Sequence, residues 1–328
     1  MLIVYREGKS HVDDTGRIMK QFGTADGVTW TPPEVLYDEP VIDDRDPSVS
    51  TLANGNVVLT YFQYKTIVAT DGEFAVGHVF VATSSDDGQT FGALTQVDPG
   101  SMSPTNPKLN AMGKWVDDAN REITLYACSS PVLERNGQWT LPAYGGAAIS
   151  GASPKWTLSM FETSTTGSTW TETRTLENAL PDAWVTEPSL VRLASGKTLM
   201  HFRTADGESA GNAGKMMQSV STDDRKTWST PTPFSFVGHA PELAQFSSGL
   251  VLSAYRELDD ELTREKVAFS WSLNEGSTWS DSIQVIDCGG SECGYQSIVE
   301  LDRERFLLAY YAPGGKAIKA VIYRYSLE

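Results

Sequence analysis

The stretch SSDDGQTF, residues Ser84–Phe91, has the form Ser/Thr-x-Asp/Asn-x-Gly-x-Thr-aromatic, and related stretches recur along the chain. The other copies are Thr24–Trp30 (TADGVTW), Thr163–Trp170 (TSTTGSTW), Ser221–Trp228 (STDDRKTW) and Ser272–Trp279 (SLNEGSTW). A short pattern repeated at intervals of several tens of residues is typical of a fold built from similar structural units. The sequence therefore predicts a repeat protein.

The residue types of this motif are those of a tight turn. Ser and Asp side chains bond backbone groups two residues on, Gly allows a positive φ, and the closing aromatic side chain attaches the turn to the core. Some copies depart from the pattern: Thr165 replaces the acid in the third, Arg225 replaces Gly in the fourth, and Asn274 replaces the acid in the fifth. The motif therefore predicts where the chain turns and carries no catalytic chemistry.

A second pattern lies between these turns and is typical of β-hairpins, with a strand, a tight turn and a second strand that ends in an aromatic residue. Its copies are Asp46–Phe62, Asn106–Tyr126, Glu187–Phe202, Ala240–Tyr255 and Tyr295–Tyr310, and a sixth without its first strand ends at Tyr5. A hairpin, a further strand, the turn motif and a last strand make one four-stranded antiparallel blade. We therefore predict an all-β fold, a six-bladed β-propeller forming one domain over residues 1–328. Five blades is the alternative.

The chain is strongly acidic, with a net charge of −16 over 328 residues and a pI of about 4.7. This charge repels phosphate backbones and anionic lipids, so we expect neither nucleic acid nor a membrane as partner. The apolar run at Met1–Arg6 is too short for a signal-peptide core, and no later stretch resembles a membrane span. We expect a soluble protein, either cytoplasmic or exported with its signal removed or by another route. The oligomeric state stays open.

Three cysteines are present, and Cys288 and Cys293 are near neighbours in the segment CGGSEC. One local disulfide between them is an option. Cys128 follows a strand-like segment and is expected to be a small buried residue. The spacing matches no zinc site, and we expect no metal or organic cofactor.

The start of the first strand and the end of the second lie on the same rim of each predicted hairpin, because the chain runs down and returns. The arginines at such positions are Arg6, Arg45, Arg203 and Arg256. In an acidic chain they form a concentrated cationic pocket, and guanidinium groups bind carboxylates through two hydrogen bonds. Together with Asp46 they predict a site for an acidic small molecule or sugar acid. The alternative is that each arginine pairs with a carboxylate of the protein, such as Asp46 or Glu257.

Two other residues of this rim, Glu187 and Tyr295, begin strands of separate blades. A phenol with a pKa of about 10 is a weak nucleophile unless a neighbouring carboxylate takes its proton. A neutral Tyr suits a substrate with a carboxylate at its anomeric carbon, because that carboxylate would repel a charged nucleophile. The alternatives are that Tyr295 caps the channel and that Glu187 pairs with an arginine.

The polar segment Glu7–Asp14 follows Arg6 and is long enough to lean over the rim. Asp13 or Asp14 is the candidate general acid/base, and His11 is a candidate substrate contact or alternative proton carrier. A solvated turn with a surface His is the alternative.

These residues, in this order, resemble the sialidase (neuraminidase) superfamily of Asp-box, or BNR-repeat, β-propellers, over essentially the whole chain. The resemblance implies an arginine triad for the substrate carboxylate, an Asp acid/base in a loop of the first blade, and a Tyr nucleophile paired with a Glu. Glu187 and Arg203 look like the family's Glu and second triad arginine, Arg256 looks like the third, and Tyr295 looks like the nucleophile.

The first blade departs from the family pattern. Arg6 looks like the family's additional first-blade arginine, followed by the loop that holds the acid. The first triad arginine lies in an Arg-Ile-Pro segment whose counterpart would precede Met1, and the Glu that orients it is replaced near Tyr311. Arg45-Asp46-Pro47 resembles that segment but belongs to the next blade. These departures weaken the case for ordinary sialic acid more than the case for a glycosidase.

The leading prediction is an exo-acting, retaining glycoside hydrolase for a terminal acidic sugar, with sialic acid first. Tyr295 would attack the anomeric carbon with the help of Glu187, and Asp13 or Asp14 would protonate the leaving oxygen. Propellers host many functions, so two alternatives stand beside it. One is other carbohydrate chemistry, a polysaccharide lyase or an inverting glycosidase that uses His11 and an Asp. The other is a non-catalytic carbohydrate-binding propeller.

Overall fold

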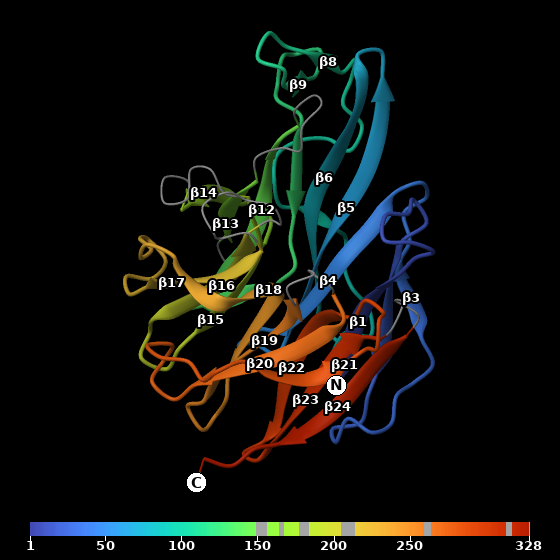
Figure 1. Ribbon diagram of the computed structural model, residues 1–328. Coiled ribbons are helices and arrows are strands. Elements are labelled where there is room, and N and C mark those ends of the chain that lie inside the picture. The colour runs from blue at the N-terminus through green and yellow to red at the C-terminus, as the bar shows by residue number, and fades with distance from the viewer. Residues whose placement is uncertain are drawn as a thin grey trace. The chain divides into compact units, whose positions relative to one another are not determined.

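The computed structural model describes residues 1–148, 156–163, 167–176, 184–204, 214–258, 264–312 and 317–327, and every regular element in these ranges is a β-strand (Figure 1). The predicted all-β class is confirmed. The same ranges hold no helix with the length and apolar character of a membrane span. The chain separates into a C-terminal unit, Met1, Gly23–Trp30 and Asn178–Glu328, and an N-terminal unit, Leu2–Phe22 and Thr31–Glu177.

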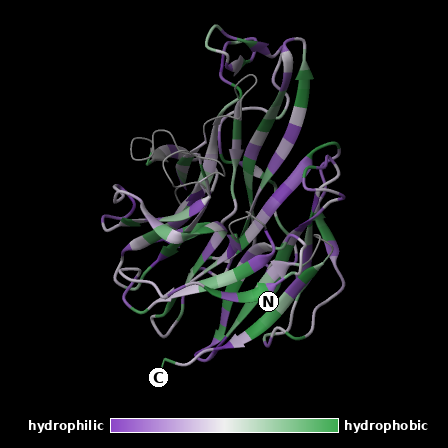
Figure 2. Ribbon diagram, in the orientation of Figure 1, coloured by the Kyte–Doolittle hydropathy of each residue, from purple (hydrophilic) through white to green (hydrophobic). Residues whose placement is uncertain are grey.

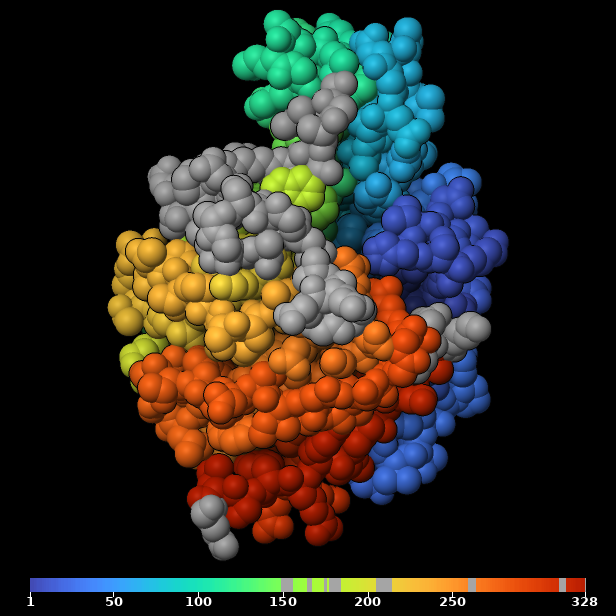
Figure 3. Space-filling model, viewed as in Figure 1, coloured from blue at the N-terminus to red at the C-terminus, as the bar shows by residue number. Residues whose placement is uncertain are grey.

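The C-terminal unit contains a seven-stranded antiparallel sheet and a three-stranded sheet, and in both the strands pair in chain order. The strands are β15 (Val185–Arg192), β16 (Thr198–Thr204), β17 (Lys215–Ser221), β18 (Thr232–Gln245), β19 (Val251–Leu258), β20 (Lys266–Ser272), β21 (Ile283–Asp287), β22 (Gly294–Asp302), β23 (Arg305–Tyr311) and β24 (Ile318–Arg324). The first half of β18 pairs with β17 and its second half pairs with β19. One long strand, β18, therefore joins two successive four-stranded groups. In Figure 3, the atoms of β18 to β24 form a continuous surface.

The N-terminal unit contains a three-stranded sheet, a nine-stranded sheet and a small hairpin. Its strands are β1 (Leu2–Glu7), β2 (Arg17–Phe22), β3 (Glu34–Tyr37), β4 (Asp43–Thr51), β5 (Val57–Ala69), β6 (Gly72–Ser84), β7 (Thr95–Gln96), β8 (Lys108–Leu109), β9 (Trp115–Val116), β10 (Thr124–Ala127), β11 (Leu133–Arg135), β12 (Gln138–Ala147), β13 (Thr157–Thr163) and β14 (Thr171–Thr175). The hairpin of β5 and β6 is paired over its whole length (Figure 1). Its far end packs on β9, where the rings of Phe74 and Trp115 stack with centroids 4.3 Å apart.

The repeated motifs form turns with a shared set of hydrogen bonds. In the Ser84–Phe91 copy, Asp86 accepts bonds from Ser84 Oγ at 2.7 Å and from the Thr90 amide at 2.9 Å. The corresponding amide bonds run from Thr227 to Asp223 and from Thr278 to Asn274, each at 2.9 Å. Arg225, at the position of the motif's Gly, has a φ of +67°. In the third copy, residues 164–166 lie outside the described ranges.

Apolar side chains of the strands form the core beneath these turns, and hydrophobic stretches follow the strands of both units in Figure 2. In the C-terminal unit, Phe246, Phe269, Phe306 and Leu308 belong to one buried cluster. Full burial of each such side chain contributes about 1.5–3 kcal/mol, which holds β19, β20, β22 and β23 firmly against one another. Residues at the ends of these strands are therefore fixed in place.

The structure decides the state of the cysteines, which the sequence left open for Cys288 and Cys293 and predicted as buried for Cys128. Cys288 and Cys293 form a disulfide with their Cα atoms 6.4 Å apart, and Cys128 is fully buried as a free thiol.

Candidate active site

Three residues lie at matching places in the C-terminal unit. Glu187 is near the start of β15, Ala240 is in β18 just after its pairing changes from β17 to β19, and Tyr295 is near the start of β22. Their φ angles are +53°, +47° and +46°, and the pairing register shifts beside each of them. Such a β-bulge aims a side chain away from the alternation of the strand. Pro follows two of them, Pro188 and Pro241, and Pro has no N–H to leave unpaired where the ladder is interrupted. A non-glycine residue at positive φ costs about 1–3 kcal/mol and persists where its surroundings hold it.

The Glu187 carboxylate is the centre of a buried hydrogen-bond network. Its Oε1 accepts a bond from the phenol of Tyr295 at 2.7 Å, and its Oε2 accepts one from the Ala240 amide at 2.9 Å. Glu187 is 5% exposed. Burial alone would raise the pKa of Glu187, but the charge of Arg203 and the bond from Tyr295 outweigh it and lower this pKa to about 2. Glu187 is thus a carboxylate at any ordinary pH.

Arg203, on β16, fixes the other side of Glu187. Its Nε lies 3.0 Å from Glu187 Oε2 and also donates to Thr186 Oγ1 at 3.0 Å. Its Nη1 donates to Nδ1 of the buried His239. The cation therefore neutralises Glu187 and is held in a single orientation.

Arg256, on β19, lies beside the phenol of Tyr295, with Cζ 5.3 Å from the ring centroid. Its Nε donates to the Cys293 carbonyl at 2.9 Å, and its Nη2 donates to Tyr311 Oη at 2.8 Å. Its Nη1 lies 3.3 Å from the carboxylate of Glu292. A cation next to an aromatic ring stabilises negative charge that develops on the phenol oxygen.

A second cluster lies in the N-terminal unit, around the buried carboxylate of Asp43. Arg6 Nε donates to Asp43 Oδ1 at 2.7 Å, and Arg45 Nη1 donates to Oδ2 at 2.9 Å. Gly16 passes so close that a Cβ there would lie 1.9 Å from Asp43 Oδ1. The strand register next to Arg45 shifts, and Asp46 has a φ of +46°. Asp46 thus shares the positive φ of Glu187 and Tyr295.

The loop after Arg6 is anchored on this cluster by its backbone. The Ser10 and His11 carbonyls accept bonds from Arg6 at 3.0 Å and from Arg45 at 2.5 Å, while the side chain of His11 is exposed. The Asp13 carboxylate accepts bonds from Thr15 Oγ1 at 2.8 Å and from the amide of Lys9 at 2.6 Å.

Hydrogen bonds from Thr15, followed by smaller contributions, lower the pKa of Asp13 to about 2. Asp14 is exposed.

The structure thus gathers Glu187, Tyr295, Arg203 and Arg256 in one unit, and Arg6, Arg45, Asp46 and the loop of His11, Asp13 and Asp14 in the other. Every one of the four rim arginines has a protein carboxylate as partner. The partners are Asp43 for Arg6 and Arg45, Glu187 for Arg203, and Glu292 for Arg256. Each of the two clusters is therefore much closer to neutral than its arginines alone indicate.

Sequence reasoning missed Asp43 and Glu292 as parts of these clusters. Asp43 precedes Arg45 by two residues, and the period of a strand puts both on one face, so this signal was available. Glu292 had no such signal, because its contact with Arg256 depends on how a loop folds back. Across the described ranges, no three His, Cys, Asp or Glu side chains gather as a metal site requires.

Comparison with protein families decides the relationship. The BNR repeat-like domain matches residues 2–306. The chain belongs to the BNR repeat-like family. None of the curated proteins matches this BNR repeat-like chain by sequence.

Solved structures show the fold of this BNR repeat-like protein. A protein of unknown function from Dyadobacter fermentans has a TM-score of 0.74 at 21% identity, over 98% of this chain and 90% of that one. The intramolecular trans-sialidase from Ruminococcus gnavus, in complex with oseltamivir carboxylate, has a TM-score of 0.66 at 12% identity, over 98% and 91%. An ulvan lyase has a TM-score of 0.55 at 10% identity, over 98% and 75%. At these identities the likeness establishes a sialidase-like β-propeller fold, and the resemblance to the sialidase superfamily is confirmed.

Proposed function

We propose that this protein is an exo-acting, retaining glycoside hydrolase that releases a terminal acidic sugar, with sialic acid as the first candidate. The observation that carries the proposal is the 2.7 Å hydrogen bond from the Tyr295 phenol to the Glu187 carboxylate. A phenol needs such a base to act as a nucleophile, and Glu187 is ionised with its second oxygen anchored by Ala240.

In the first step, Tyr295 Oη bonds to the anomeric carbon while the glycosidic C–O bond breaks. The phenolic proton passes to Glu187, and the leaving oxygen takes a proton from an acid of the N-terminal loop. In the second step, water attacks the anomeric carbon while the bond from this carbon to Tyr295 Oη breaks. The proton of the water passes to the loop acid, and Tyr295 regains its proton from Glu187. The cation of Arg256 next to the ring favours the charge that develops on Oη.

Asp14 suits the role of acid/base better than Asp13. The Asp13 carboxylate is held by three donors within its own loop, and these keep its pKa at about 2, further from neutral pH than that of an ordinary Asp. Asp14 is exposed in the same loop.

The substrate would be bound by Arg6, His11, Arg45, Asp46, Arg203 and Arg256, with the arginines meeting its acidic group. Arg6 offers a specific donor: its Nη2 is enclosed and has no hydrogen-bond acceptor among the described residues. A buried N–H without an acceptor is costly, and a ligand oxygen would satisfy it.

We further propose that the strands make six blades. The groups are β1–β3, β4–β7, β10 with β12–β14, β15–β18, β18–β21 and β22–β24. The second half of β18 then serves as the inner strand of the fifth blade.

A polysaccharide lyase is the second candidate, because an ulvan lyase shares the fold. A lyase uses a Tyr as acid or base and leaves a C=C bond in its product. The released sugar separates these functions, since a hydrolase gives a saturated reducing sugar. Mass spectrometry also separates hydrolysis from the intramolecular transfer for which the Ruminococcus gnavus protein is named.

The test is release of 4-methylumbelliferone from its α-sialoside, followed by a panel of uronic-acid and other acidic-sugar glycosides. Turnover of one of these substrates that is lost in Tyr295→Phe supports the proposal. Glycan binding without turnover across the panel, unaffected by Tyr295→Phe, would identify a non-catalytic binding protein instead.

A further inference from the structure

The guanidinium of Arg256 is enclosed by the C-terminal unit along most of its edge. Its Nε donates to the Cys293 carbonyl, and its Nη2 donates to the Tyr311 hydroxyl. The ring centroids of Tyr295 and Tyr311 lie 5.3 and 5.7 Å from its Cζ. The side chain is only 2% exposed. The group that faces its Nη1 therefore decides what else Arg256 can bind.

That group is the carboxylate of Glu292. Its Oε1 lies 3.3 Å from Arg256 Nη1 and 3.7 Å from Arg264 Nη1. The Glu292 side chain is 41% exposed, so it approaches the buried cation from the solvent side. A carboxylate of the protein thus occupies the place that the carboxylate of a bound ligand would need.

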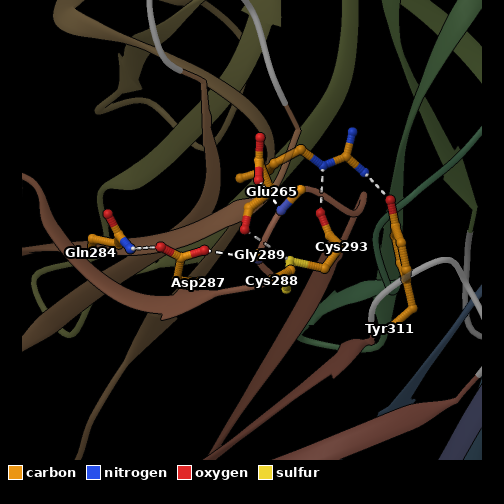
Figure 4. The surroundings of a disulfide bond; sticks show 9 residues. Glu265, Gln284, Asp287, Cys288, Gly289, Cys293 and Tyr311 are labelled. Atoms are coloured by element: carbon orange, nitrogen blue, oxygen red, sulfur yellow. Dashed lines mark hydrogen bonds between the residues drawn. A yellow bond between two sulfur atoms is a disulfide. The ribbon is translucent and has the colours of Figure 1, made fainter.

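The loop that carries Glu292 is held tightly. The disulfide between Cys288 and Cys293 closes it, and the amides of these two cysteines donate to the Glu265 and Arg264 carbonyls at 2.8 and 2.9 Å. Figure 4 shows this disulfide together with the Cys293 carbonyl and the Tyr311 hydroxyl, the two groups to which Arg256 donates.

Gly294 follows directly, and a Cβ there would lie 2.6 Å from Arg256 Nε. The anchoring keeps the local concentration of the Glu292 carboxylate beside Arg256 high.

We propose that Glu292 is a specificity-determining residue that occupies Arg256 and must be displaced by the anionic group of the substrate. The contact is suited to exchange. It is longer than a charge-assisted hydrogen bond, and its carboxylate is 41% exposed, so solvent weakens the pair from the Glu292 side. The buried pair of Arg203 and Glu187, with side chains 18% and 6% exposed, is not open in this way. The inference rests on the proposed function only in taking Arg256 as the residue that meets the substrate.

Glu292 then works as a built-in competitor. It lowers the affinity for every anionic sugar and leaves the affinity for a neutral analogue unchanged. Replacement by Gln removes the competing charge while it preserves size, so the affinity for a sugar acid should rise about tenfold.

The test is calorimetric titration of the Tyr295→Phe protein, in which turnover is blocked, with N-acetylneuraminic acid, glucuronic acid and their methyl esters. The same titrations are made with Glu292→Gln and with Glu292→Ala added. Asp287→Asn is the matched control, because it removes one negative charge next to the same disulfide and Asp287 has no described contact with Arg256. Thermal unfolding checks that each variant is folded.

Tighter binding of an acid in both Glu292 variants, with the ester and the Asp287→Asn protein unchanged, supports the proposal. Weaker or equal binding of the acids in the Glu292 variants overturns it, since Glu292 would then support Arg256 rather than compete. Failure of every variant to bind either acid also overturns it. None of these results depends on catalysis, and the glycosidase proposal is judged separately by turnover of the wild-type protein.

Discussion

The phenol of Tyr295 donates to the carboxylate of Glu187 at 2.7 Å across 108 residues of sequence. Both residues have a positive φ at a β-bulge, and both side chains are aimed at one point by that strained backbone. Strain of this kind is kept where the surrounding structure requires it, and it concentrates at functional sites.

Replacement of Tyr295 by Phe removes the proposed nucleophile together with its hydrogen bond to Glu187. We expect kcat to fall by about 10³-fold or more, while the lost hydrogen bond costs about 1–3 kcal/mol of stability. Tyr323→Phe is the control, because it removes a phenol that donates to the Val285 carbonyl at 3.3 Å, outside the site. Steady-state turnover of both variants measures the effect, and full activity in Tyr295→Phe would exclude Tyr295 as the nucleophile.

The pH profile of activity should respond to Arg203. Its cation, acting against burial, holds the pKa of Glu187 at about 2, and loss of the cation raises that pKa. Because Glu187 must be ionised, the acid limb of kcat/KM in Arg203→Met should move upward by about 1–3 pH units. Arg305→Met, which breaks an exposed pair with Asp302, should leave the limb in place. An unmoved limb in Arg203→Met would show that another group sets it.

Substrates with poor and good leaving groups should show which of Asp13 and Asp14 is the general acid. Asp14→Asn should slow a natural glycoside, which needs protonation, by about 10²-fold or more, and should slow an aryl glycoside with a good leaving group far less. Asp13→Asn should affect both substrates alike, because Asp13 ties the loop together through Thr15 and Lys9. The opposite pattern would assign the acid to Asp13.

Asp44 should make stability depend on pH. It is fully buried, and burial, partly offset by bonds from Glu39 and Gln63, raises its pKa from 3.8 to about 6. The folded state then binds more protons than the unfolded state between these values. Asp44 therefore contributes its full share to the free energy of unfolding below pH 4, and this share is lost as the pH rises through 6. The loss is about 3 kcal/mol at pH 7.

Urea unfolding at pH 4 and pH 7 measures this loss. Asp44→Asn should gain stability relative to the wild type as the pH rises, and Asp281→Asn, at an exposed position, should not. Parallel pH curves for Asp44→Asn and the wild type would refute the assignment.

The all-β fold class and the positions of the turns could be predicted because they depend on residues that are close together in the sequence. Asp86 and Thr90 are four residues apart, and their bonds form within one turn whatever the rest of the chain does. The places of Glu187 and Tyr295 near the starts of strands followed from the hairpin pattern for the same reason. The β-bulges at these residues did not follow, since a positive φ at Glu or Tyr is against the preference of both.

The charge of the site is where sequence reasoning was incomplete. It indicated a strongly cationic rim, and the structure pairs Arg6 and Arg45 with Asp43, Arg203 with Glu187, and Arg256 with Glu292. The second interpretation of these arginines, pairing with carboxylates of the protein, holds for all four.

The sequence alone determined the β-strands and the turns of this protein, because hydrogen bonds between neighbours in the chain and the alternation of apolar residues are written into short segments. The tertiary structure alone decided which carboxylate meets which arginine and how exposed each pair is. Electrostatic interactions depend on distance and burial in three dimensions, and residues such as Arg256 and Glu292 acquire both only when strands distant in sequence pack together.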